Sequence, residues 1–174
     1  GVIQSLGHEA VKLWHKDTDL QNCEFIIIPG GFSYGDYLRS GAIARFSPIM
    51  DHVIEHAKNG GYLMGICNGF QVLVEAHLLP GVLLRNHTQK FISKNIFLKA
   101  ATNNSLLTHS LNTQKAYKVP IAHAEGRYFT DEKTLASLKA NDQILFYYCD
   151  ADAQVTEESN PNGSLLNIAG ICNE

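Results

Sequence analysis

A cysteine with a glycine two positions away on each side is the feature of this sequence best suited to covalent chemistry. The segment Gly65-Ile66-Cys67-Asn68-Gly69 has the form of a nucleophile elbow, in which a strand turns directly into a helix. Such a turn strains the central residue and brings its neighbours so close that a β-carbon at the glycine positions would clash. Cys67 would face the amino end of the helix, which favours thiolate over thiol. We therefore expect a nucleophile, with a small buried cysteine beside two incidental glycines as the alternative.

Backbone N–H groups near this cysteine are candidates for stabilising an oxyanion. The N–H of Asn68 would point to the place where the oxyanion forms. Pro29-Gly30-Gly31 follows an apolar run, and its backbone could donate a second N–H to the same oxygen. Taken alone, the Pro-Gly-Gly segment is more typical of an ordinary turn.

His123-Ala124-Glu125 is similar to the base and orienting half of a Cys-His-Glu triad. A histidine that acts as a base needs an acceptor on its second ring nitrogen. Side chains two positions apart in an extended segment share a face without necessarily touching. A structural or binding role for His123 is therefore at least as well supported as a catalytic one.

The segment His52-Val53-Ile54-Glu55-His56 matches the H-x-x-E-H pattern of some zinc peptidases. The predicted helix already uses Ile49, Val53 and Ala57 for its core face, which turns both histidines towards solvent. We therefore predict no metal site in this chain.

Apolar runs and helical patterns alternate along the sequence. Strands are predicted at 25–28, 62–66, 91–100, 117–122 and 144–149, with a last apolar run over 165–171. Helices are predicted in the first eleven residues, from Pro48 until Asn59, and over 70–77 and 130–140. This alternation predicts an α/β fold with a mainly parallel sheet, whose functional residues lie at the carboxyl ends of strands.

The composition is that of one globular domain of 174 residues, 45% of them hydrophobic. Fourteen Lys and Arg against seventeen Asp and Glu give a net charge of -3 without a basic cluster, so neither nucleic acid nor a membrane is an expected partner. No apolar run reaches membrane-spanning length. The four cysteines are scattered without metal-site or dithiol spacing, which indicates a reducing, cytoplasmic location.

Several stretches together resemble the glutaminase component of phosphoribosylformylglycinamidine synthase, a class I (triad) glutamine amidotransferase. They are Pro29–Arg39, Gly65–Gln71, Leu79–Gly81, Leu84–Asn86, Pro120–Tyr128, Asn160–Ser164 and Ile168–Glu174. The resemblance covers nearly the whole chain. It implies a three-layer, flavodoxin-like fold with a mainly parallel twisted sheet and helices on both faces.

The resemblance also implies an activity. L-Glutamine would be hydrolysed to glutamate and ammonia through a thioester on Cys67, and a partner synthetase would use the ammonia to amidate formylglycinamide ribonucleotide in purine synthesis. Gly31 and Asn68 would form the oxyanion hole, and the residues lining the substrate pocket would be Gly30, Gln71, His123, Ala124 and Glu125. No cofactor is expected in this chain, since ATP and Mg belong to the synthetase. A small accessory subunit is a further candidate partner.

One departure from the family pattern concerns the catalytic base. The family carries its catalytic histidine and glutamate in an H-P-E segment downstream of the stretch that resembles Ile168–Glu174, where this sequence stops. The first strand of the family fold would also precede Gly1. We therefore expect a single amidotransferase domain over 1–174 that lacks its first strand and its triad His and Glu, and that is a poor glutaminase by itself. His123 and Glu125 are not assigned to the triad, because the resemblance places them elsewhere in the pocket.

Other hypotheses stay open. A non-catalytic glutamine-binding or regulatory module would keep the fold and the pocket without turnover. A different cysteine-elbow hydrolase would act on other substrates, and a zinc peptidase is the last alternative. Phe32–Arg39 lies beside the expected oxyanion loop and is a candidate gate, with Tyr34 and Asp36 as the residues to test.

Overall fold

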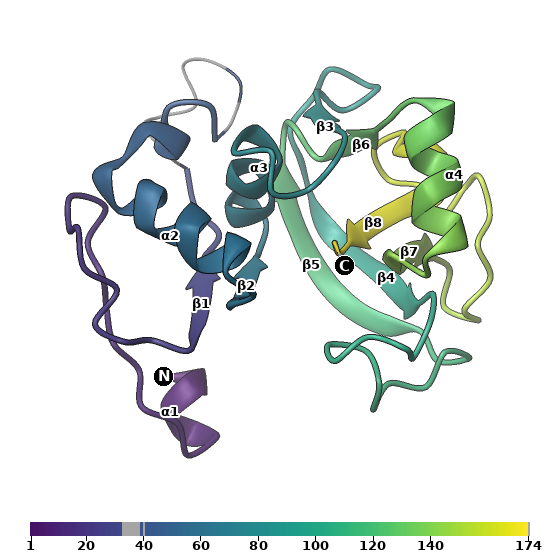
Figure 1. Ribbon diagram of the computed structural model, residues 1–174. Helices are drawn as coiled ribbons and strands as arrows, with labels where there is room; N and C mark the ends of the chain where they lie inside the picture. The colour runs from purple at the N-terminus through teal and green to yellow at the C-terminus, as the bar shows by residue number, and fades with distance from the viewer. Residues whose placement is uncertain (33–38, 40, 174) are drawn as a thin grey trace. The chain divides into compact units, whose positions relative to one another are not determined.

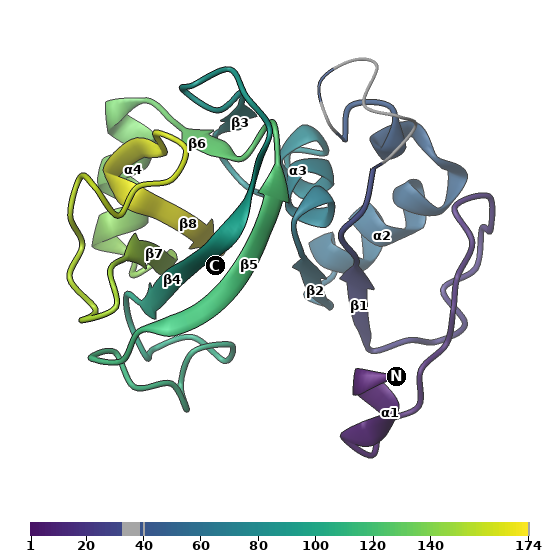
Figure 2. The ribbon, with the colours of Figure 1, turned by 180° about the vertical axis from the view of Figure 1, so that it is seen from behind.

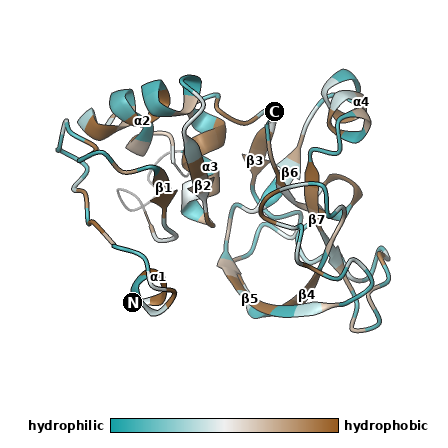
Figure 3. Cartoon of the chain, turned by 60° about the horizontal axis from the view of Figure 1, so that its bottom comes forward, coloured by the Kyte–Doolittle hydropathy of each residue, from teal (hydrophilic) through white to brown (hydrophobic). Residues whose placement is uncertain are grey.

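A parallel strand pair lies in the first compact part of the chain, residues 1–78. The structure is a computed structural model that describes residues 1–32, 39 and 41–173 (Figure 1). β1 (Phe25–Ile28) and β2 (Tyr62–Gly65) are in register from Phe25 opposite Tyr62 to Ile28 opposite Gly65. β1 is apolar throughout, as its brown colour shows in Figure 3. Aromatic and β-branched residues of this kind favour an extended chain.

Two helices accompany these strands. α2 (Pro48–Lys58) has Pro48 in its first turn, where the missing N–H costs no hydrogen bond, and its C-cap is Asn59. α3 (Asn68–Glu75) begins almost directly after β2. The shorter elements in this part of the chain are α1 (Val2–Ser5) and the 3-10 turn η2 (Ala44–Phe46).

The core of this first unit joins both helices to β1. Its buried members are Ile26 of β1, Met50 and Val53 of α2, and Val72 of α3. Burying such side chains contributes roughly 1.5–3 kcal/mol each. This packing fixes the two loops that follow β1 and β2 at their carboxyl ends.

Residues 79–174 form the second compact unit, in which strands run antiparallel. A four-stranded sheet has the order β5-β4-β7-β8, made of β4 (Ile92–Ala100), β5 (Tyr117–His123), β7 (Ile144–Cys149) and β8 (Ile168–Ile171). β4 and β5 lie side by side as long curved strands (Figure 2). A separate pair joins β3 (Val82–Leu84) to β6 (Arg127–Phe129), which directly follows the turn after β5.

One helix, α4 (Glu132–Ala140), lies beside β7 and β8 in Figures 1 and 2. The side chain of Asp131 caps its amino end by accepting the Thr134 N–H at 2.9 Å. Leu138 of this helix is almost fully buried. The 3-10 turn η3 (Leu165–Asn167) leads into β8.

The predicted mixed α/β class is confirmed, but a mainly parallel sheet is not what the described residues show. β1 and β2 pair in parallel, whereas the pairs of the other sheets are antiparallel. The reason lies in the connections. Residues 29–61 carry a helical crossover, but the 101–116 connection between β4 and β5 contains no helix and returns the chain antiparallel.

One further expectation needed correction, and two short strands were missed. The apolar spacing in the first eleven residues predicted a helix, yet α1 stops at Ser5 and Gly7 follows with φ of 84°. β3 and β6 were not predicted, because three residues are too few to show a strand period. Among the helices of the described part of the chain, none has the length and apolar character needed to cross a membrane.

Candidate active site

Cys67 occupies the sharp turn between β2 and α3. It is exposed and takes φ of 54° and ψ of -110°, a backbone conformation that residues with a side chain rarely adopt. As the cap residue of α3, it lies at the amino end of that helix, which is the positive end of the helix dipole. The strained elbow expected from the sequence is therefore present.

The two glycines around Cys67 allow this turn to close. A β-carbon on Gly65 would lie 2.6 Å from the carbonyl carbon of Gly69 and 2.7 Å from Cδ1 of Leu73. A β-carbon on Gly69 would overlap the carbonyl oxygen of Ile28 in β1. The glycine spacing is thus set by close backbone packing of strand, turn and helix.

The loop after β1 runs directly beside Cys67. A β-carbon on Gly30 would be 3.2 Å from Cβ of Cys67 and 3.8 Å from its Sγ. Gly31 follows with φ of 152°, which favours glycine. The predicted neighbourhood of Gly30 and Cys67 is therefore observed. The candidate gate, with Tyr34 and Asp36, lies largely outside the described residues.

Asn68 and Gln71 are buried in the first turn of α3, and their side chains are bonded to each other. Nδ2 of Asn68 donates to Oε1 of Gln71 at 2.9 Å. This bond fixes the orientation of the Gln71 amide. The side chain of Gln71, the predicted substrate-binding residue, is therefore buried and hydrogen-bonded within the helix that follows Cys67.

His123, Ala124 and Glu125 stand at the end of β5, in the second unit. Nδ1 of His123 pairs with Oδ1 of Asn86 at 3.0 Å, so the acceptor on this nitrogen is a neutral amide. Burial lowers the pKa of His123, because desolvation disfavours the imidazolium. The arrangement favours a neutral, fixed imidazole.

The H-x-x-E-H segment lies on α2 with Val53 turned into the core, as predicted. Nε2 of His56 is 3.3 Å from the carbonyl oxygen of Tyr62. No cluster of three or more His, Cys, Asp or Glu side chains suited to a metal ion occurs within residues 1–32, 39 and 41–173.

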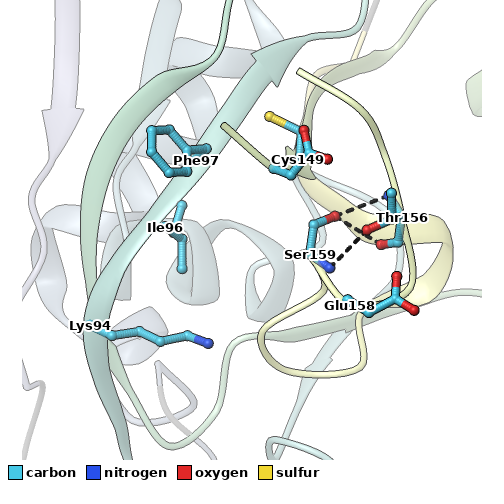
Figure 4. Close-up of a pocket in the computed structure, with 8 residues that line it drawn as sticks. Lys94, Ile96, Phe97, Cys149, Thr156, Glu158 and Ser159 are labelled. Carbon is cyan, nitrogen blue, oxygen red and sulfur yellow. Dashed lines mark hydrogen bonds between the residues drawn. The ribbon is translucent and has the colours of Figure 1, made fainter. Parts of the chain in front are cut away.

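A cavity of about 460 Å³ lies in the second unit, and its lining contains none of the predicted site residues (Figure 4). Its walls are Lys94, Ile96, Phe97, Cys149, Asp150, Thr156, Glu158 and Ser159. Burial, reinforced by the Asp150 carboxylate, raises the pKa of the Cys149 thiol. Cys149 is therefore a poor nucleophile at neutral pH.

Two buried polar residues, Glu75 in the first unit and Asn86 in the second, had no predicted role. Glu75 of α3 binds the Arg39 guanidinium, and Asn86 binds the turn after β5. Each pairs with a residue 36 or 37 positions away, so no local pattern in the sequence marks them.

Comparison with known proteins places this geometry in a family. A model of the CobB/CobQ-like glutamine amidotransferase domain matches residues 6–174. Phosphoribosylformylglycinamidine synthase subunit PurQ of Koribacter versatilis is 54% identical over 162 residues, which are 93% of this chain and 70% of that protein. The subunit of the same name from Synechocystis is 53% identical over 161 residues, with 92% and 72% covered. The chain belongs to the PurQ family of glutamine amidotransferases.

A solved structure agrees with this membership. A chain in the structure of PurLQS from Thermotoga maritima matches with a TM-score of 0.75 and 38% identity, over 91% of this chain and 66% of that one. The PurQ relationship confirms the family inferred from the sequence, and with it a glutamine amidotransferase subunit of phosphoribosylformylglycinamidine synthase. The expected individual roles of the site residues remain predictions.

Proposed function

We propose that this PurQ-family chain hydrolyses L-glutamine to glutamate and ammonia with Cys67 as the nucleophile. The observation that carries the proposal is the exposed Cys67 in a strained turn at the amino end of α3. Backbone strain of this kind persists only where the surrounding packing maintains it, and it is typical of functional sites. Here the absence of side chains at Gly65 and Gly69 allows the close backbone packing that maintains the turn.

The reaction would proceed in two balanced steps. The thiolate of Cys67 attacks the side-chain carbonyl carbon of glutamine, the C–N bond breaks, and nitrogen leaves with an added proton as ammonia. Water then attacks the thioester, giving glutamate and restoring the thiol. Backbone N–H groups of Gly31 and Asn68 would stabilise the oxyanion in both steps.

Gly30 and Gln71 of the first unit, and His123, Ala124 and Glu125 of the second unit, are each proposed to bind the substrate, as the family resemblance implies. His123 is assigned to binding and not to the catalytic base. In a triad, a carboxylate on the second ring nitrogen stabilises the imidazolium, whereas His123 has the neutral amide of Asn86 there. Its lowered pKa agrees with this assignment.

The ammonia would be consumed by a synthetase partner that binds ATP and Mg and amidates formylglycinamide ribonucleotide. The relationship to a chain of PurLQS supports such a partner, and a small accessory subunit is a further candidate. We place this activity in the cytoplasm, on the evidence of the composition. We also assign β1 and β2 to a larger parallel sheet, and α2 and α3 to the helical layers of a three-layer fold. The reason is that Cys67 and Gly30 both follow the carboxyl ends of paired parallel strands.

The test uses the chain assembled with its synthetase partner. Cys67→Ala should abolish formylglycinamidine synthesis from glutamine, while synthesis from added ammonia continues. An electrophilic glutamine analogue should add once to the wild-type chain, on Cys67, and should not label Cys67→Ala. Cys149→Ala is the matched control and should keep both glutamine turnover and labelling.

Two results would overturn the assignment. Glutamine-dependent activity in Cys67→Ala would remove Cys67 as nucleophile. Glutamine binding without turnover or labelling in the wild-type assembly would instead identify a non-catalytic binding module.

A further inference from the structure

Basic and acidic residues are unevenly distributed along this chain. Between residues 76 and 124 the sequence contains six Lys and Arg and no Asp or Glu, although acidic residues outnumber basic ones in the whole chain. All six cations belong to the second unit. Such an imbalance between parts of a chain indicates a surface that interacts with anionic groups. The fold then determines which of these cations lie together.

The loop between β3 and β4 carries the first two of these cations, Arg85 and Lys90, and the fold adds a third beside them. Arg127 of β6 is directly opposite Leu84 of β3, the residue that precedes Arg85. Arg85 and Lys90 are exposed, and Arg127 is partly buried. Residues far apart in the sequence therefore meet here. We call Arg85, Lys90 and Arg127 the basic loop surface.

Side-chain positions also place Arg127 beside this loop. A β-carbon on Gly163 would lie 3.7 Å from Cδ of Arg127 and 2.8 Å from Cβ of His87. Gly163 is exposed and has no side chain, so Arg127 and His87 both pack against the same point of its backbone. His87 lies between Arg85 and Lys90 in the sequence of the loop. The basic loop surface is therefore continuous from the loop to β6.

The cations of the basic loop surface have no anionic partner in the part of the chain that the structure describes. Among residues 1–32, 39 and 41–173, the carboxylate that forms a salt bridge is that of Glu75, and its partner is Arg39 of the first unit. Nε of Arg127 is buried and has no hydrogen-bond acceptor within the same residues. A buried N–H without an acceptor costs free energy, so this guanidinium is suited to an acceptor from another molecule. A carboxylate matches the planar fork of a guanidinium best.

Hydrogen bonds fix the backbone of the 85–90 loop before any partner binds. Asn86 is fully buried, and its Nδ2 donates to the carbonyl oxygen of Lys90 at 2.8 Å. The N–H of His87 donates to the carbonyl oxygen of Asn162 at 2.9 Å. A loop that is already ordered loses less conformational entropy when a partner binds. The basic loop surface is thus preorganised for association.

We propose that Arg85, Lys90 and Arg127 form a docking surface for an acidic segment of the synthetase partner. This inference rests on the proposed function, which requires that partner. A short acidic segment of a protein needs only local charge complementarity. A nucleic acid or an anionic membrane would extend over more of the chain, and the net charge of -3 opposes such contacts.

The first test measures the affinity of the full chain for its synthetase at low and high salt. The double variant Arg85→Glu with Lys90→Glu should bind roughly tenfold or more weakly at about 50 mM salt, and the difference should shrink at about 500 mM salt because ions screen the charges. The matched control is Lys133→Glu with Lys139→Glu, at two exposed positions of α4. It changes the net charge equally and should keep the wild-type affinity. Urea unfolding checks that both variants fold.

The second test identifies the contact directly. A zero-length carbodiimide reagent joins a lysine amine to a carboxylate, so in the assembled complex it should join Lys90 to an Asp or Glu of the synthetase. Lys90→Arg keeps the positive charge and should keep the affinity while losing this cross-link. Arg127→Gln should weaken binding, and Arg127→Lys should restore only part of the loss because an ammonium lacks the guanidinium fork.

The outcomes separate this inference from the proposed function. If the glutamine analogue labels Cys67 but charge reversal at Arg85 and Lys90 leaves the affinity unchanged, the inference fails and the proposed function stands. An affinity loss that is equal at both salt concentrations, or equal in the α4 control, also overturns the inference. Salt-dependent weakening in an assembly whose Cys67 is never labelled would support the docking surface and remove the proposed function. A wild-type chain that does not bind a synthetase overturns both.

Discussion

The carboxylate of Glu75 on α3 is bound by the guanidinium of Arg39 through two contacts. Nε of Arg39 lies 2.5 Å from Oε1, and Nη2 donates to Oε2 at 2.9 Å. Close by, a β-carbon on Gly41 would lie 2.8 Å from the backbone nitrogen of Val72. Arg39 and Gly41 are therefore both in contact with α3, the helix that Cys67 caps.

The Arg39–Glu75 pair should contribute measurably to stability. The side chain of Glu75 is 9% exposed and that of Arg39 is 53% exposed, so solvent screens the attraction, and we expect a coupling energy of about 1 kcal/mol. A double-mutant cycle of Arg39→Ala and Glu75→Gln, measured by urea unfolding, checks this value. Strict additivity of the two changes would show that the pair does not couple.

The glycines of the elbow should differ sharply from other glycines on substitution. Gly69→Ala forces a β-carbon into the carbonyl of Ile28, so we expect a loss of more than about 3 kcal/mol and no labelling of Cys67. Gly60→Ala is the control: its φ is 83°, but nothing lies within 4 Å of the added carbon. That variant should lose only about 1 kcal/mol and keep full labelling. Equal losses in the two variants would contradict the packing explanation.

The elbow could be predicted from the sequence because its cause is local. Gly65, Cys67 and Gly69 lie within five residues, and the strand before and the helix after have clear apolar patterns. Strands β4 and β7 were found for the same reason. Their antiparallel pairing was not, because apolar runs identify strands without giving the direction of their neighbours.

The residues that hold the candidate site were harder to predict. Asn86 and His123 are 37 positions apart, and Arg39 and Glu75 are 36 apart. An asparagine or a glutamate in an otherwise ordinary segment carries no sign that it will be buried. Such contacts depend on tertiary structure, and a single sequence does not show which distant residues will pair.

His123 should make the protein less stable in mild acid. Burial lowers its pKa in the folded state below the ordinary value of 6.5, so the unfolded chain binds more protons once the pH falls below 6.5. The free energy of unfolding should therefore decrease as the pH falls through this range. Urea unfolding at several pH values between 7.5 and 5 should show a shallower decrease in His123→Gln than in wild type. Parallel curves would assign the acid sensitivity to other groups.

Tyr128 should make the protein less stable in alkali. Its side chain is buried, its hydroxyl donates to the carbonyl of Pro80 at 3.0 Å, and burial raises its pKa to about 12 from the ordinary value of 10. The folded state therefore keeps its proton longer than the unfolded chain, and stability present below pH 10 should be lost as the pH rises towards 12. A difference of this size between the folded and unfolded pKa values corresponds to about 2–3 kcal/mol of unfolding free energy.

Tyr128→Phe separates this titration from packing. The variant cannot ionise at this position, so it should start less stable at pH 8 by about 1 kcal/mol, because the hydrogen bond to Pro80 is missing. Its free energy of unfolding should then fall less between pH 10 and pH 12 than that of wild type. Gly81→Ala serves as a packing control, since its β-carbon would lie 2.6 Å from the hydroxyl oxygen and 2.7 Å from Cε2 and Cζ of Tyr128, while the hydroxyl can still ionise. If Tyr128→Phe kept the full alkaline loss, another group would have to carry it.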